Sequence, residues 1–155
     1  MMGLFAAYRL NMRVVMLEKC IVMLNSIRSE IQYLLLPSSE IIESLALRKD
    51  LSELTFLQDC KRRILDGSDF RTAWREALEN NGLSLCFNKD DIHILISFSE
   101  LFGVTGCDGQ FLNCNLYCEK LQSALNDAKK AKEKYSRLFS SLGLLAGLYF
   151  IIIFI

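Results

Sequence analysis

Three cysteines in the last third of the chain are the residues best placed for thiol or metal chemistry. Cys107, Cys114 and Cys118 lie close together, and the spacing of the last two puts both on one face of a helix. A zinc site would require a fourth ligand, and the sequence contains no C-x-x-C pair to supply one. The pattern therefore favours buried structural thiols, and a tail-anchored thiol or metal sensor that uses these three cysteines is the alternative.

Candidates for acid–base catalysis are few. His93 is the one histidine of the chain, and it lies in an apolar run. Asp90 and Asp91 follow Asn88 as acids do in the first turn of a helix, where the helix dipole favours negative charge. The sequence has no phosphate-binding loop, nucleophile elbow or H-E-x-x-H motif. We therefore expect a protein that is not an enzyme and that binds no metal and no cofactor.

The charge of the chain is balanced overall but uneven along its length. It has 18 basic and 18 acidic residues and a formal net charge of 0. Nucleic-acid binding would require a broad basic face, so no nucleic-acid partner is expected. The segment 129–137 nevertheless holds five basic residues, with Glu133 as its one acid. A basic segment beside an apolar helix favours contact with anionic lipid headgroups.

That apolar helix is predicted at the end of the chain, where residues 138–155 carry no charge. At about 1.5 Å per helical residue the segment is roughly 27 Å long, close to the hydrocarbon thickness of a bilayer. We predict a transmembrane helix there, with the bulk of the chain in the cytoplasm, because Lys and Arg beside a span stay on the cytoplasmic side. Gly143 and Gly147 form a Gly-x-x-x-Gly pair, which favours close packing of membrane helices and self-association.

The remaining sequence predicts an all-α fold, an antiparallel bundle of about six helices. Helices are expected at about residues 8–35, 38–48, 51–65, 70–79 and 88–103, and a long last helix from Gln110 runs into the membrane. Four leucines of this last helix are predicted to pack on the bundle: Leu112, Leu116, Leu121 and Leu125. The chain is thus divided into the remnant of an N-terminal membrane segment at 1–7, a cytoplasmic bundle at 8–125, a basic helical stalk at 126–137 and the transmembrane helix at 138–155.

Two features of the bundle are candidates for partner binding. Lys61, Arg62 and Arg63 form a basic triplet on a short helix, which is usually a solvated face and alternatively binds an acidic partner surface. Trp74 lies on the apolar stripe of the fourth helix, which favours a place in the core. The alternative for Trp74 is an interface anchor, because aromatic residues are enriched at binding hot spots.

Several segments, taken in order, resemble the stage III sporulation protein AB family of endospore-forming bacteria. They are FAAYRL at 5–10, LNSIRSEIQY at 24–33, AWREAL at 73–78, ELFG at 100–103, DGQ at 108–110, KYSRL at 134–138 and SLGLLAG at 141–147. The resemblance covers nearly the whole chain. The family normally has an N-terminal membrane segment, of which residues 1–7 are the candidate remnant.

This resemblance implies a non-enzymatic membrane component of the sporulation channel complex between mother cell and forespore. It also implies a soluble domain similar to the helical cytoplasmic domain of type II secretion F proteins. The location it implies for the protein is the mother-cell membrane. The partners it implies are a cytoplasmic secretion-type ATPase and other membrane subunits. We expect a mechanical scaffold whose partner contacts include the basic triplet, Trp74, Gly103, Asp108, Gly109 and Gln110.

Overall fold

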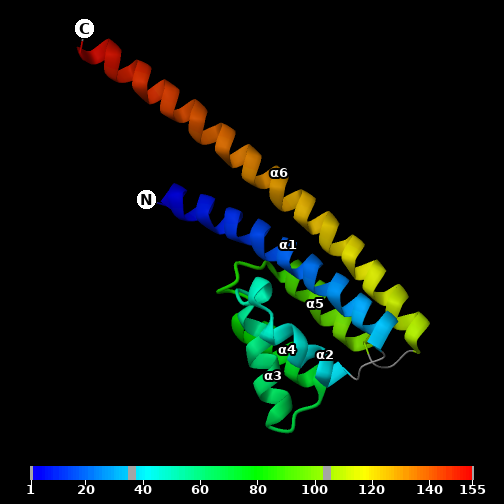
Figure 1. Ribbon diagram of the computed structural model, residues 1–155. Helices are drawn as coiled ribbons and strands as arrows, with labels where there is room; N and C mark the ends of the chain where they lie inside the picture. The colour runs from blue at the N-terminus through cyan, green and yellow to red at the C-terminus, as the bar shows by residue number, and fades with distance from the viewer. Residues whose placement is uncertain (1, 35–37, 103–105, 155) are drawn as a thin grey trace.

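The computed structural model describes residues 2–34, 38–102 and 106–154, and every regular element in these ranges is a helix (Figure 1). In chain order the elements are α1 (Met2–Leu34), α2 (Ser38–Leu47), the short 3-10 helix η1 (Lys49–Leu51), α3 (Thr55–Leu65), α4 (Phe70–Asn81), α5 (Lys89–Leu101) and α6 (Cys107–Phe154). The prediction of an all-α bundle is therefore confirmed. The predicted end of the first helix, at about residue 35, lies outside the described residues.

Side-chain caps begin two of the helices, both at the boundaries predicted from the sequence. Asn88 and Asp91 form a capping box at the start of α5, in which Asp91 N donates to Asn88 Oδ1 at 2.7 Å and Asn88 N donates to Asp91 Oδ2 at 2.9 Å. Asp69 caps α4, where its carboxylate accepts from Thr72 N at 3.2 Å. Gly67, with φ of 98°, ends α3 in the left-handed conformation that glycine tolerates.

Two predicted boundaries differ from the structure. The helix expected at residues 51–65 is divided, because a turn from Leu51 to Leu54, closed by a 2.9 Å hydrogen bond from Leu54 N to Leu51 O, separates η1 from α3. Both leucines are buried, so this turn lets the chain change direction while keeping two apolar side chains in the core. The last helix begins at Cys107, earlier than predicted, and Gln110 N bonds Gly106 O at 2.9 Å in its first turn.

Helices α1 and α6 lie antiparallel along one side of the molecule, so that the start of α1 and the end of α6 point the same way (Figure 1). Polar contacts fix their register along the whole pairing. They are Arg28 Nη1 to Asn115 Oδ1 at 2.8 Å, Glu18 Oε1 to Lys129 Nζ at 2.8 Å, and Lys132 Nζ to Asn11 Oδ1 at 2.6 Å. The polar segment 126–137 was predicted to project as a single-helix stalk. The structure differs, because α1 lies beside this segment, buries Ala128 and bonds Lys132 through Asn11.

Only two of the four leucines predicted to face the bundle do so. Leu121 and Leu125 are buried together with Tyr117 and Ala128, at spacings of three and four residues along α6. Leu112 and Leu116 lie on the opposite face of the helix and are 70% and 45% exposed. The prediction was wrong for this pair, because the sequence shows that α6 is amphipathic but does not show which leucines share the face that α1 covers.

The predicted membrane segment is helical as far as Phe154, and Ile155 lies outside the described residues. Within the part of the chain that is described, no helix combines the length and the apolar character required to cross a membrane. The transmembrane helix at 138–155 is therefore not confirmed.

Candidate interaction surfaces

The basic triplet of α3 does not form an open cationic surface. Each of its side chains has a carboxylate partner: Lys61 Nζ lies 3.3 Å from Glu43, Arg62 Nη2 lies 2.5 Å from Asp59, and Arg63 contacts both Asp59 and Glu76. These pairs connect α3 to α2 and to α4. The solvated interpretation is thus favoured, because an acidic partner would first have to displace the internal carboxylates.

Trp74 belongs to the core. Its side chain is fully buried, and Nε1 donates a 2.8 Å hydrogen bond to the carbonyl oxygen of Leu95 on α5. Its ring packs edge-on against Phe56, with ring centroids 5.1 Å apart, and lies against Phe70 and Phe98. Trp74 therefore joins α3, α4 and α5, and no partner can reach it without unfolding this part of the bundle.

The predicted contact segment around residues 103–110 lies partly at the start of α6. Gly103 falls outside the described residues. Asp108 is exposed in the first helical turn, and Gly109 and Gln110 are half-buried. Immediately after them come the two exposed leucines, Leu112 and Leu116, one helical turn apart on the outer face.

We call Asp108, Leu112 and Leu116 the distal surface, because α6 carries it at the end opposite to its C-terminus (Figure 1). Single exposed apolar residues are ordinary on a protein surface, but these two leucines share one helix face beside an acidic helix start and form a continuous apolar surface there. The sequence analysis assigned the two leucines to the core, whereas the structure leaves both exposed.

The other end of α6 presents apolar side chains on all the faces that are described. They include Leu138, Leu142, Leu144, Leu145, Leu148, Ile151 and Ile152, each at least half exposed. A Cβ added at Gly143 or Gly147 would meet nothing within 4 Å, so the small-residue face of this segment is open to a second helix.

Sequence reasoning missed one buried ion pair. Arg13 on α1 binds Asp91 on α5 through two hydrogen bonds, Nε to Oδ2 at 2.7 Å and Nη2 to Oδ1 at 2.9 Å. Asp91 is fully buried, and this contact raises the pKa of Arg13. A signal was available in the sequence, because Arg13 is four residues before Leu17 on the apolar face of α1, and Asp91 is four residues before the buried Leu95. A charge on an apolar helix face usually has a buried partner.

The arrangement of the helices and their surfaces can be compared with known proteins. The family model described as stage III sporulation protein AB matches residues 1–155, which is the whole chain. The chain belongs to the stage III sporulation protein AB family.

Two individual comparisons agree with this assignment to stage III sporulation protein AB. The curated stage III sporulation protein AB of Bacillus subtilis (strain 168) is 28% identical over 131 residues, which cover 84% of this chain and 77% of the relative. A solved structure of a stage III sporulation protein AB superposes with a TM-score of 0.65 at 24% identity, covering 79% of this chain and 98% of that one. The first match supports the family, and the second shows the fold. The chain is therefore a sporulation protein, and membership of the stage III sporulation protein AB family supports a role as a non-enzymatic subunit of a sporulation complex.

The alternative of a thiol or metal sensor finds no support in the described residues of this family member. The side chain of Cys107 is outside them, Cys114 is buried, and Cys118 Sγ lies 3.9 Å from Asn25 Oδ1. Among the described side chains, no group of three His, Cys, Asp or Glu residues is placed to hold a metal ion. Burial raises the pKa of Cys114 to about 12, which removes the thiolate that both metal binding and thiol exchange require.

Alkylation of the native chain tests this conclusion. We expect iodoacetamide at neutral pH to label the half-exposed Cys86 and to leave Cys60 and Cys114 unlabelled, because burial raises the pKa of both buried thiols to about 12. Mass spectrometry of the full chain in mild detergent, with a urea-unfolded sample as the control, gives the labelling at each cysteine. Labelling of Cys114 as fast as Cys86, or bound zinc at one ion per chain, would restore the sensor hypothesis.

Proposed function

We propose that this protein is a membrane-attached scaffold subunit of the sporulation channel complex between mother cell and forespore. In this proposal it performs no catalysis. Its distal surface binds a cytoplasmic secretion-type ATPase, and the apolar end of α6 joins the other subunits in the mother-cell membrane. The observation that carries the proposal is the continuity of α6, which runs without a break from Cys107 to Phe154.

The continuity of α6 suits a mechanical link. Its 48 residues extend about 70 Å, so the two ends of one rigid element can contact different partners. The 33 residues of α1 lie beside much of this length and share a buried apolar seam with it. Two packed helices resist bending more than one helix does, so displacement at the distal surface is transmitted to the opposite end.

Membrane attachment is proposed for residues 138–155. The segment carries no charge, and the described leucines and isoleucines of its helix are exposed rather than packed on the bundle. Exposed apolar area of this extent is stabilised by lipid or by apolar helices of a partner. The basic residues that precede it favour the cytoplasmic side for the bundle.

The open face at Gly143 and Gly147 supports a helix contact inside the membrane. Glycines four residues apart allow a second backbone to approach closely, and packing of this kind drives association of helices in lipid. We propose that another subunit of the complex, or a second copy of the chain, occupies this face.

The ATPase contact is proposed at the distal surface because this part of α6 lies farthest from the apolar end (Figure 1). Leu112 and Leu116 provide apolar contact area, and Asp108 provides a charge for orientation. The similarity that the family implies to the helical domain of type II secretion F proteins is consistent with an ATPase partner, as an analogy of fold.

The experiment that tests the scaffold role interrupts α6 between its two ends. Insertion of Gly-Ser-Gly after Lys130 should remove function in sporulating cells while the bundle stays folded, because only the mechanical connection is broken.

A further inference from the structure

A group of uncompensated positive charges surrounds the paired helices just before the apolar end of α6. Arg9, Lys130, Lys134 and Arg137 are exposed, and none of them forms an ion pair with another residue of the described chain. Lys132 Nζ donates a hydrogen bond to the neutral Asn11 Oδ1 and forms no ion pair within the described residues, so its charge is also uncompensated. We call these five residues the basic belt.

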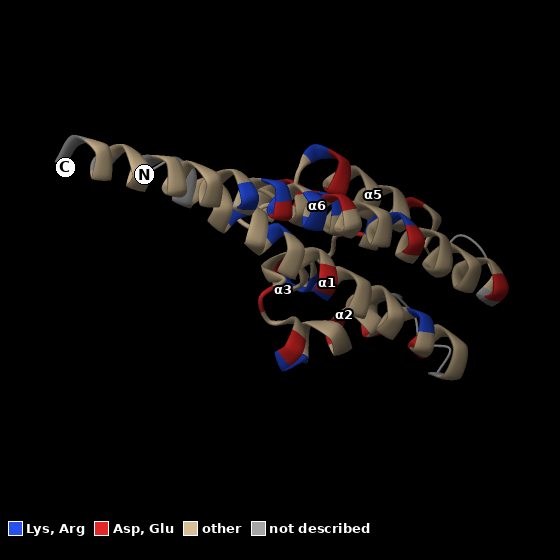
Figure 2. Cartoon of the chain, turned by 90° about the horizontal axis from the view of Figure 1, so that it is seen from above, with Lys and Arg blue, Asp and Glu red and all other residues tan. Residues whose placement is uncertain are grey.

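The register of α1 and α6 brings the belt together from two helices. Because Asn11 pairs with Lys132 in an antiparallel arrangement, Arg9 lies level with Lys134. Lys130, Lys134 and Arg137 line one side of α6 together with Glu133, which is the one acidic residue of the segment 129–137. In Figure 2 the helix pair carries blue Lys and Arg segments, and the end of the pair that leads to the C-terminus is tan and without charged residues.

Basic residues elsewhere on the bundle often have carboxylate partners. Examples are Lys19 with Glu53, Arg48 with Asp50, Lys61 with Glu43, and Arg75 with Glu100. The belt therefore differs from the rest of the surface in gathering five such charges near one level of the helix pair, where an external anionic surface can contact them together.

The residues that adjoin the belt indicate the class of anion that it binds. Tyr8 and Tyr135 are at the level of the belt, and beyond it both helices carry apolar side chains, with Phe5 on α1 and Leu138 on α6 exposed. Cations and tyrosines at one level, followed by apolar residues, is the order of polarity that a helix meets on entering a bilayer. A nucleic acid or an acidic protein would match the charges but not the apolar residues that adjoin them.

We propose that the basic belt binds anionic phospholipid headgroups and that the protein therefore prefers acidic membranes. The inference rests on the membrane attachment proposed above and adds the class of lipid. Each basic residue held near an anionic surface strengthens binding by about fivefold at low salt, and the effect fades at high salt because the Debye length falls to about 3 Å at 1 M.

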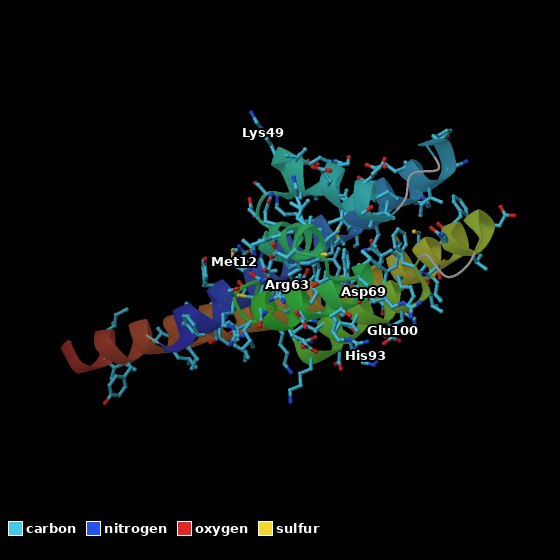
Figure 3. The ribbon with its side chains drawn as sticks, turned by 90° about the horizontal axis from the view of Figure 1, so that it is seen from below. Met12, Lys49, Arg63, Asp69, His93 and Glu100 are labelled. Carbon is cyan, nitrogen blue, oxygen red and sulfur yellow. The ribbon has the colours of Figure 1, made fainter. Side chains whose placement is uncertain are left out.

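Vesicle flotation of the full chain tests the proposal. The protein is diluted from mild detergent into vesicles of phosphatidylglycerol and phosphatidylcholine, or of phosphatidylcholine alone, and the bound fraction is measured against lipid concentration. The belt variant Lys134→Gln/Arg137→Gln should bind the anionic vesicles about 25-fold more weakly than wild type, with unchanged binding to neutral vesicles. The control variant Lys49→Gln/Arg71→Gln removes an equal number of positive charges from exposed positions on η1 and α4 (Figure 3 shows Lys49 in solvent). It should bind both kinds of vesicle as wild type does.

The outcomes separate this inference from the proposed function. A wild-type chain that binds neither kind of vesicle contradicts the membrane attachment and the lipid preference together. Equal binding to both kinds leaves the attachment standing and overturns the preference. The preference is also overturned if the control variant loses as much binding as the belt variant. The preference is overturned as well if the belt variant still prefers anionic vesicles but does not support spore formation, since the belt then serves a protein partner.

Discussion

Insertion of Gly-Ser-Gly after Lys130 should reduce the yield of heat-resistant spores to that of a strain lacking the protein. The three residues rotate everything that follows by about 300° around the helix axis, and two glycines weaken the helix by about 1 kcal/mol each. Lys132 is then displaced from Asn11, so α1 no longer holds the last part of α6 in register. The buried contacts from Cys114 to Ala128 precede the insertion, so the bundle should keep its helical circular dichroism and its unfolding midpoint.

The same three residues inserted after Gly67 provide a matched control. Gly67 lies in the exposed turn between α3 and α4, where added residues leave both helices intact. A third variant carries seven helix-forming residues after Lys130, which returns the helix to within about 20° of its original face and should restore part of the function. Normal spore yield from the Gly-Ser-Gly variant at Lys130 would show that continuity of α6 is not required.

Replacement of Asp91 by alanine should destabilise the bundle by about 3–5 kcal/mol. The substitution leaves the guanidinium of Arg13 without its partner at a position where the arginine side chain is only 16% exposed, and removing one member of a buried pair has this typical cost. It also removes half of the capping box that begins α5. Urea unfolding of the full chain in mild detergent, followed by circular dichroism, measures the change in the free energy of unfolding.

Two further variants show whether the ion pair is the cause. Asp69→Ala removes a helix cap that has no buried cation behind it, so its effect should be much smaller. Arg13→Met combined with Asp91→Asn removes both charges and should be more stable than the sum of the single changes predicts, because no unpaired charge stays buried. If Asp91→Ala and Asp69→Ala have equal effects, the pair does not hold α1 to α5.

The local features of the fold were predictable from the sequence because they depend on neighbouring residues. The caps at Asp69 and Asn88 are short-range patterns, and the helices that follow them begin where expected. The apolar stripe of α4 likewise placed Trp74 in the core. In each case, the residues that decide the structure lie within one or two helical turns of one another.

The long-range features were not predictable from the sequence because they depend on how helices pair. Nothing near residue 129 indicates that Glu18 lies beside it, so the segment 126–137 resembled a solitary stalk. The exposure of Leu112 and the pairing of Lys61 with Glu43 have the same origin, since α1 and α2 decide which faces of α6 and α3 are covered. The exposure of Leu112 and Leu116 and the level of Arg9 beside the basic segment therefore became visible only in the folded chain, whereas the basic segment 129–137 was evident in the sequence.

Site-specific photo-crosslinking in sporulating cells tests most directly whether the protein links a cytoplasmic partner to the membrane. A photoreactive residue replaces Leu112 in one strain and Leu83 in another. Both leucines are exposed, but they lie at different places in the fold: Leu112 is in the distal surface of α6, and Leu83 is in the connection between α4 and α5. The account predicts that Leu112 crosslinks to a cytoplasmic ATPase, that the adduct is in the membrane fraction, and that Leu83 gives no such adduct. An absent adduct at Leu112, equal adducts at both positions, or an adduct in the soluble fraction would contradict it.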